Sequence, residues 1–258
     1  MEVGGLVVGV IGLASLFNNV LDCFNYVHIG KSFGSRFQTS LLKLDNARLR
    51  LSRWGDAVGL SGNVDDATSL PSTIASEADR RQAEKMLGQI LKLFEDARKI
   101  SDEFKGGRDP DEQSLLVHNE QTDLDPMTAS LHQKMVQLSS KRQNRTTLTK
   151  KAKFVLYEEK HLKELIDNIT SLTKELVELF PATEKQQQLC DNEVSEFSES
   201  FRVLVNAATG IDELLAAGLS EVLNKVNNLN TFHNERSVIQ QQGTSTGGRF
   251  DMKVEMPR

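Results

Sequence analysis

The most constraining feature of this chain is an uncharged apolar segment near its N-terminus, residues 3–21, "VGGLVVGVIGLASLFNNVL". A helix that is apolar nearly all round must be covered by protein or by lipid. At 1.5 Å per residue this segment is about 28 Å long, close to the roughly 30 Å hydrocarbon core of a bilayer. We therefore predict a conditional membrane helix that is stored inside the folded protein at rest. The alternative is a helix that belongs only to the protein core.

Individual residues of this segment have predicted roles. Gly5 and Gly9 are four residues apart on one helix face, a spacing that lets two helices approach closely in a membrane. The same glycines would also let the helix pack tightly within its own bundle. Asp22 is predicted to mark the border of the inserted segment, because a carboxylate inside a bilayer is costly. The predicted membrane-inserting residues are the large apolar side chains Val3, Leu6, Val7, Val8, Val10, Ile11, Leu13, Leu16, Phe17, Val20 and Leu21.

The chain lacks the usual features of a secreted protein and of an enzyme. A signal peptide carries positive charge before its apolar core, and only Met1 and Glu2 precede this segment. Cys23 and Cys190 lie far apart and form neither a metal-ligand spacing nor a disulfide framework, so we expect a cytoplasmic protein at rest. The sequence has no Walker A, G-x-S-x-G or H-E-x-x-H motif, and we predict no enzymatic activity, no metal and no cofactor.

Apolar side chains at helical spacing recur along the chain and predict an all-α fold, a single multi-helix bundle. Asp125 and Pro126 form a helix-start signal, and Gly210 forms a helix-stop signal. Residues 228–258 are polar and are predicted to form a disordered, flexible tail, so the bundle is assigned to residues 1–227. Helices are expected over residues 3–29, 33–58, 76–104, 147–180, 183–208 and 211–226, with a further helix that starts at Pro126.

Residues 126–157 contain no Asp or Glu and carry a band of basic side chains. Basic residues near a membrane surface attract anionic lipid head groups by roughly 1 kcal/mol each. Few aromatic residues accompany them and the net charge of the chain is −5, so no nucleic-acid partner is expected. A solvated helical hairpin is the alternative interpretation. The predicted head-group ligands are Lys141, Arg142, Arg145, Lys150, Lys151 and Lys153.

Several short stretches carry a resemblance to a known family. They are "LFNN" at 16–19, "DCF" at 22–24 followed by Tyr26, Gly30, "FG" at 33–34, "RLSRWG" at 50–55, "RQNRTTLTKKAKFVLY" at 142–157 and "AATGIDELL" at 207–215. In order and spacing they resemble the fungal HeLo domain, the N-terminal domain of the HET-s prion protein that is also found in the loss-of-pathogenicity B protein. The resemblance covers nearly all of residues 1–227.

The resemblance implies an all-helical domain that acts in regulated cell death or non-self recognition. In this family the domain is quiescent until its C-terminal tail assembles into an amyloid, and the N-terminal apolar segment then enters the plasma membrane and forms a pore. The implied partners are further copies of the chain, related HeLo or amyloid-signalling proteins, and anionic membrane lipids. One departure is that residues 228–258 are too few for the two amyloid repeats of about twenty residues each that the prion-type tail carries. A degenerate amyloid-type motif is the most that this tail could hold.

Two alternatives of a different class remain open at this point. One is a soluble adaptor or inhibitor that binds related HeLo proteins and never enters a membrane. The other is a pathogenicity-related protein without pore activity.

Overall fold

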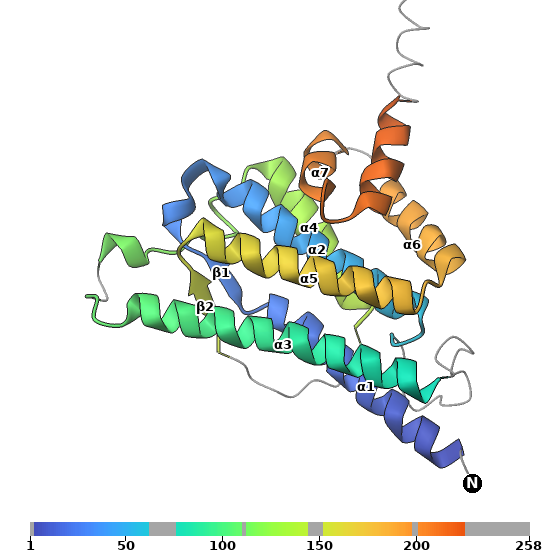
Figure 1. Ribbon diagram of the computed structural model, residues 1–258. Coiled ribbons are helices and arrows are strands. Elements are labelled where there is room, and N and C mark those ends of the chain that lie inside the picture. Colours follow the sequence, from blue (N-terminus) through green and yellow to red (C-terminus); the bar gives the residue numbers. More distant parts are fainter. Residues whose placement is uncertain (1–2, 62–75, 110–111, 144–151, 198–200, 225–258) are drawn as a thin grey trace, which may run out of the picture. The chain divides into compact units, whose positions relative to one another are not determined.

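The computed structural model describes residues 3–61, 76–109, 112–143, 152–197 and 201–224, with side chains from residue 12 onward and, in the last range, from residue 204. The predicted all-α fold is confirmed (Figure 1). The chain divides into two compact units, residues 1–219 and 220–258, and the packing below is that of the first. The predicted tail lies outside the described residues. The helices are α1 (Val3–Phe24), α2 (Phe37–Ala57), α3 (Glu77–Lys105), α4 (Pro126–Lys141), α5 (Glu159–Leu179), α6 (Thr183–Glu196) and α7 (Phe201–Ala208), and residues 213–224 are also helical.

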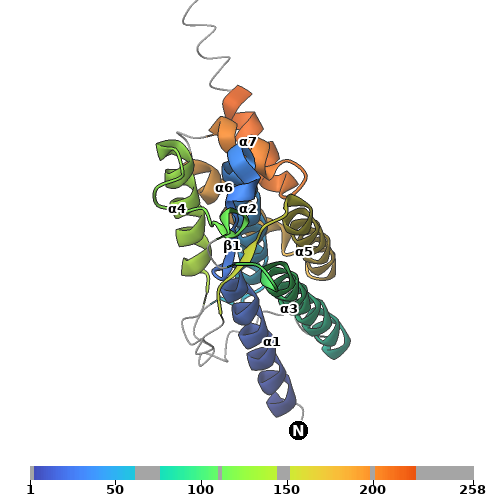
Figure 2. The ribbon, with the colours of Figure 1, turned by 90° about the vertical axis from the view of Figure 1, so that its left-hand side faces the viewer.

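Helix α2 is the centre of the first unit. It contacts α1, α4, α5, α6 and α7, while α3 lies alongside both α1 and α5 (Figures 1 and 2). Because neighbours surround α2, its polar residues are buried together with its apolar ones, among them Asp45, Arg48 and Arg53. Burial of charged groups is costly unless each finds a partner, so α2 determines where the internal polar contacts of the bundle form.

Two short strands interrupt the helical pattern. Strand β1 (Val27–Ile29) pairs in parallel with β2 (Phe154–Leu156), and Val27 lies opposite Phe154. The helix expected over residues 3–29 therefore ends at Phe24, and the helical pattern expected from residue 147 becomes α5 only at Glu159. Both expectations were wrong because a short, buried run of β-branched and aromatic residues has the same local pattern in a strand and in a helix.

Helix boundaries follow the capping signals in the sequence. The Asp125 carboxylate accepts hydrogen bonds from the backbone N–H groups of Met127 and Thr128, both at 3.0 Å, which confirms the predicted start of α4. Gly210 follows α7 with a φ of +78°, the left-handed conformation that glycine adopts most easily. Two expected helices are divided differently. The region before α2 is a 3₁₀ helix, η1 (Lys31–Arg36), and residues 183–208 contain both α6 and α7.

Candidate functional site

The candidate site is the packing of α1 against α2 and α3, because α1 carries the predicted membrane segment. Of the large apolar side chains described on this segment, Leu13, Phe17, Val20 and Leu21 are completely buried, and Leu16 is partly buried against the same core. The ring of Phe17 meets that of Trp54 on α2 edge to face, with centroids 6.3 Å apart. The described half of the predicted membrane segment is therefore part of the protein core in this structure.

The contact between α1 and α2 depends on Gly55. A methyl group at this position would overlap the ring of Phe17. Gly55 lies within α2, where glycine costs roughly 0.5–1 kcal/mol relative to alanine. The close approach of the Phe17 ring explains why the sequence places a glycine beside the buried Trp54.

The C-terminal end of α1 is also held by polar contacts. The Gln143 side-chain amide donates to the backbone carbonyl of Asn18 at 3.1 Å and to the carboxylate of Asp22. The Arg48 guanidinium donates to the side-chain oxygen of Asn25 at 2.8 Å, one residue beyond the helix. Asp22 thus lies half-buried at the point where the apolar segment ends, and its role as a membrane border stays a prediction.

The first part of α1 is described by its backbone alone. Val3, Leu6, Val7, Val8, Val10 and Ile11, together with Gly5 and Gly9, are helical, and their side chains lie outside the described residues. Within the part of the chain that the structure describes, no helix combines the length and the apolar character needed to cross a bilayer.

The predicted basic band is only partly described, and its members differ in their surroundings. Lys141 and Lys153 are exposed, whereas Arg145, Lys150 and Lys151 lie outside the described residues. Arg142 is only 8 % exposed, and its guanidinium binds the carboxylate of Glu193 on α6. In this structure Arg142 therefore belongs to an internal contact and does not share the exposed face expected of a head-group ligand.

That internal contact is part of a buried charge cluster that the sequence pattern did not reveal. Arg53 lies off the apolar stripe of α2, yet its guanidinium is buried between Glu193 and Asp212. Its Nε donates to Glu193 at 3.2 Å, and its Nη1 donates to Asp212 at 3.3 Å. Burial raises the pKa of the Glu193 carboxyl, although Arg53 and Arg142 oppose this effect. Two arginines and two carboxylates thus neutralise one another inside the bundle.

A second charge cluster joins α2, α4 and β1 to Glu120. The His132 imidazole on α4 bonds the buried Asp45 through Nδ1 at 2.7 Å and lies 3.6 Å from Glu120 through Nε2. His28 on β1 approaches the same Glu120 carboxylate at 3.6 Å. Burial lowers the pKa of His132, but the interactions with Asp45 and Glu120 together outweigh this effect and raise the pKa to about 10. The same histidines hold the pKa of Glu120 at about 2.

Neither cluster resembles a metal site. Among the described residues, no three histidine, cysteine, aspartate or glutamate side chains are placed so that they could hold a metal ion together. The two clusters connect helices that are distant in the sequence. Among their residues, only Asp212 is marked by a local sequence signal, because it follows Gly210 and precedes the helical residues 213–224, where a helix cap is expected. Its carboxylate accepts a hydrogen bond from the Leu215 backbone N–H at 3.2 Å, as a helix cap does.

Comparison with known proteins relates this arrangement to a family. Residues 5–205 match the HeLo family, described as "Prion-inhibition and propagation". Heterokaryon incompatibility protein S of Podospora anserina is 34 % identical over 223 residues, which cover 86 % of this chain and 75 % of that protein. Heterokaryon incompatibility protein s of the same fungus is 34 % identical over 224 residues, with the same coverage.

Solved structures agree with the sequence relationship. The HET-S N-terminal domain superimposes with a TM-score of 0.75 at 33 % identity and covers 88 % of this chain and 100 % of its own. A mutant HET-s N-terminal domain superimposes with a TM-score of 0.73 at 32 % identity, covering 82 % of this chain and 98 % of its own. This chain, with its buried first helix and its central α2, therefore belongs to the HeLo family.

Proposed function

We propose that this chain is a cell-death domain of the heterokaryon-incompatibility type, and that α1 leaves its place against α2 and α3 to disrupt a membrane. The observation that carries the proposal is the uncharged segment of residues 3–21, whose described half is packed as core at rest. The names of the relatives support the biological setting. The proposal places the resting chain in the cytoplasm and the activated chain at the plasma membrane, and it assigns no enzymatic activity.

The energies of the two environments explain why the segment could be retained until activation. Eleven large apolar residues favour membrane insertion by about 0.3–0.6 kcal/mol each, or roughly 3–7 kcal/mol in total. Burying Leu13, Phe17, Val20 and Leu21 in the protein is worth roughly 1.5–3 kcal/mol each. The resting fold therefore holds α1 at least as strongly as a bilayer attracts a single copy of it.

Activation must consequently weaken the packing of α1 or add favourable contacts in the membrane. Self-association through Gly5 and Gly9 would supply such contacts, because small residues at this spacing let helices approach closely. The bonds from Gln143 to Asn18 and Asp22 would have to break if the whole segment moved. We therefore propose a homo-oligomer as the active form, with anionic lipids and related HeLo or amyloid-signalling proteins as partners.

Dye release from vesicles that contain anionic lipid tests this proposal. Val10→Lys places a charge in the middle of the segment and should abolish release, whereas Val10→Leu keeps the segment apolar and should retain it. Circular dichroism and gel filtration should be run on each variant to show that it is folded. If folded Val10→Lys releases dye at the wild-type rate, α1 is only a core helix and the proposal fails.

A second candidate function is a soluble adaptor or inhibitor that binds related HeLo proteins, or a pathogenicity-related protein without pore activity. The complete burial of Leu13, Phe17, Val20 and Leu21 favours it, because a chain that never releases α1 needs this packing. This candidate predicts no dye release by the wild-type chain at any lipid composition. A stable complex with a related HeLo protein under the same conditions would then support the adaptor.

A further inference from the structure

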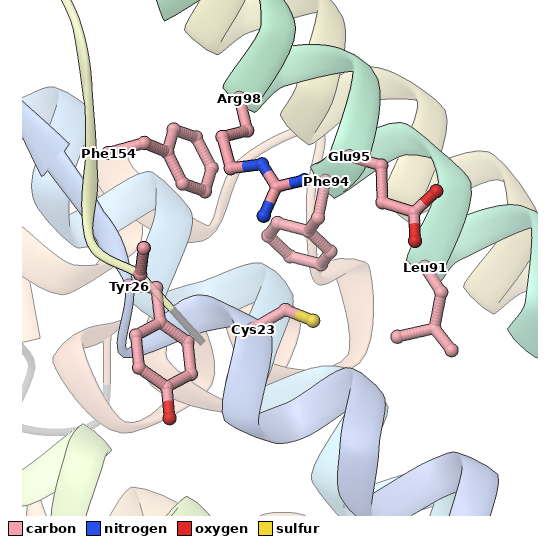
Figure 3. Close-up of a pocket in the computed structure, with 8 residues that line it drawn as sticks. Cys23, Tyr26, Leu91, Phe94, Glu95, Arg98 and Phe154 are labelled. Atoms are coloured by element: carbon pink, nitrogen blue, oxygen red, sulfur yellow. The ribbon is translucent and has the colours of Figure 1, made fainter. Parts of the chain in front are cut away.

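A small cavity lies where α1, α3 and β2 meet (Figure 3). Its volume is about 100 Å³, somewhat smaller than the roughly 150 Å³ apolar cavity that accommodates benzene in a well-studied protein. It is open to solvent on one side. The residues around it are Cys23, Tyr26, Leu91, Phe94, Glu95, Arg98, Ala152 and Phe154.

The inner wall of the cavity is apolar. Phe94 and Phe154 are buried, and Leu91 and Tyr26 are partly buried beside them. The thiol of Cys23 donates to the backbone carbonyl of Asn19 at 3.2 Å, so it presents only a weakly polar surface to the cavity. An apolar group that enters this space would replace water against aromatic rings, which is favourable.

The mouth of the cavity carries one charge of each sign on opposite sides. Figure 3 shows the Arg98 guanidinium on the side of Phe154 and the Glu95 carboxylate on the side of Leu91. Both side chains are exposed, and within the described part of the chain Arg98 has no carboxylate partner.

We propose that this cavity binds a free single-chain carboxylate, with an apolar chain of about four to six carbons in the cavity and the carboxylate at Arg98. The apolar wall selects the chain, and the exposed Arg98 guanidinium, which has no carboxylate partner among the described residues, selects a negative head group over a positive one. Glu95 on the other side of the mouth disfavours a ligand with a second negative charge.

Such a ligand would also stabilise the packed position of α1, an inference that rests on the release of α1 in the proposed function. Cys23 belongs to α1, Leu91, Phe94 and Arg98 belong to α3, and Phe154 belongs to β2. The complete cavity exists only while these elements are packed together. A molecule that binds this state and not the opened one stabilises it by mass action, so the carboxylate would hold α1 in its resting place.

Binding is tested by titrating the full chain with hexanoate, hexylammonium and hexan-1-ol, followed by NMR chemical shifts and by calorimetry. We expect hexanoate to bind about tenfold more tightly than hexylammonium and to shift the signals of Cys23 and Phe94. Arg98→Gln should weaken hexanoate binding about five- to tenfold, whereas Glu95→Gln should strengthen it. Lys85→Gln, which removes an exposed charge elsewhere on α3, should leave binding unchanged.

The result that would overturn the proposal is hexanoate binding no tighter than that of hexylammonium, or equally tight in Arg98→Gln and in the wild type. Leu91→Trp fills the cavity and should abolish binding; retained binding in this variant would place the ligand elsewhere and equally refute the site. Anionic-lipid vesicles that shift the same signals more strongly than hexanoate would show a membrane lipid as the ligand, contrary to the proposal.

Hydrogen exchange then separates this inference from the proposed function. Hexanoate should slow the exchange of the α1 backbone amides around Cys23, because it stabilises the closed packing. Binding without slower exchange would refute the effect on α1 and leave the binding site in place. This measurement needs no membrane. It therefore tests the ligand site and its effect on α1 even if the chain never releases dye from vesicles.

Discussion

Arg53 on α2 and Asp212, which are 159 positions apart in the sequence, form an ion pair in which each side chain is only 1 % exposed. The same Asp212 accepts the Leu215 N–H and so caps the helical residues 213–224. One carboxylate thus connects the central helix to the last described helical segment. Removing the charge of Asp212 should therefore lower the free energy of unfolding of the whole domain.

Asp212→Asn should lower the free energy of unfolding by about 3–5 kcal/mol, because it leaves the Arg53 charge buried with only Glu193 as a partner. Urea unfolding followed by circular dichroism measures this change. Glu213→Gln alters the exposed carboxylate next in sequence and should change stability by less than about 0.5 kcal/mol. Equal effects of the two changes would contradict the importance of the buried pair.

Gly55→Ala and Gly88→Ala should have opposite effects on stability. A methyl group at Gly55 overlaps the Phe17 ring, so this change should destabilise the domain by about 1–3 kcal/mol. Among the described residues, no atom beyond the adjoining backbone of α3 lies within 4 Å of a methyl group at Gly88, so that change should stabilise the helix by about 0.5–1 kcal/mol. Thermal unfolding gives both values, and combining Gly55→Ala with Phe17→Leu should recover part of the loss.

The His132 cluster should make stability depend on pH in the alkaline range. The pKa of His132 rises from its ordinary value of 6.5 to about 10 in the folded protein, where the group lies between Asp45 and Glu120 with His28 and Arg48 nearby. A raised pKa contributes stability that is complete below pH 6.5 and is lost as the pH rises through 10.

His132→Gln should therefore be less stable than the wild type at pH 6, and the difference should shrink by about 2–4 kcal/mol between pH 7 and pH 10. Urea midpoints measured across this range provide the test. His161→Gln, a histidine change on α5, should retain the wild-type decline over the same range. A constant difference between His132→Gln and the wild type at every pH would show that the imidazole is not held in its charged form.

Charge reversal at the exposed members of the basic band tests the lipid prediction. Lys141→Glu with Lys153→Glu should weaken binding to anionic vesicles by roughly 1 kcal/mol per residue near the surface, with the largest loss at low salt. Lys85→Glu with Lys174→Glu changes the net charge equally, on exposed positions of α3 and α5. Vesicle sedimentation over a salt series should distinguish the pairs, and identical binding curves would exclude the band as the lipid contact.

Local signals in the sequence were sufficient for several helices and for some of their ends, but not for the ends of α1 and α5 near the strand pair. The Asp125 cap, the Gly210 stop and the apolar spacing in α3 are features of consecutive residues, and the structure confirms them. The pairing of Val27 with Phe154 could not be foreseen in this way, because a strand pair depends on a partner far along the chain.

The buried charges were missed for a related reason. Periodicity assigns an arginine to the surface, and the burial of Arg53 follows only when α6 and the residues after Gly210 cover that side of α2. The burial of Arg142 could not be predicted for the same reason. Its sequence neighbours indicate an exposed basic face, whereas its partner Glu193 is on another helix. The apolar segment of the candidate site could therefore be predicted from the sequence. The contacts that keep this segment in the core could not, because they come from residues far along the chain.

The turn between α1 and β1 constrains any motion of the first helix. Only Asn25 and Tyr26 separate Phe24 from the strand pair, and their backbone N–H groups bond to the carbonyls of Asp22 and Cys23. With β1 hydrogen-bonded to β2, the C-terminal end of α1 is tethered to the strand pair, so α1 can turn at this end, which changes how Cys23 faces α3, but cannot move far from it. If α1 swings outward, its N-terminal end at Val3 moves along an arc with a radius of about 33 Å, the length of 22 helical residues. The rest of the domain must then stay within one helix length of whatever surface that end reaches.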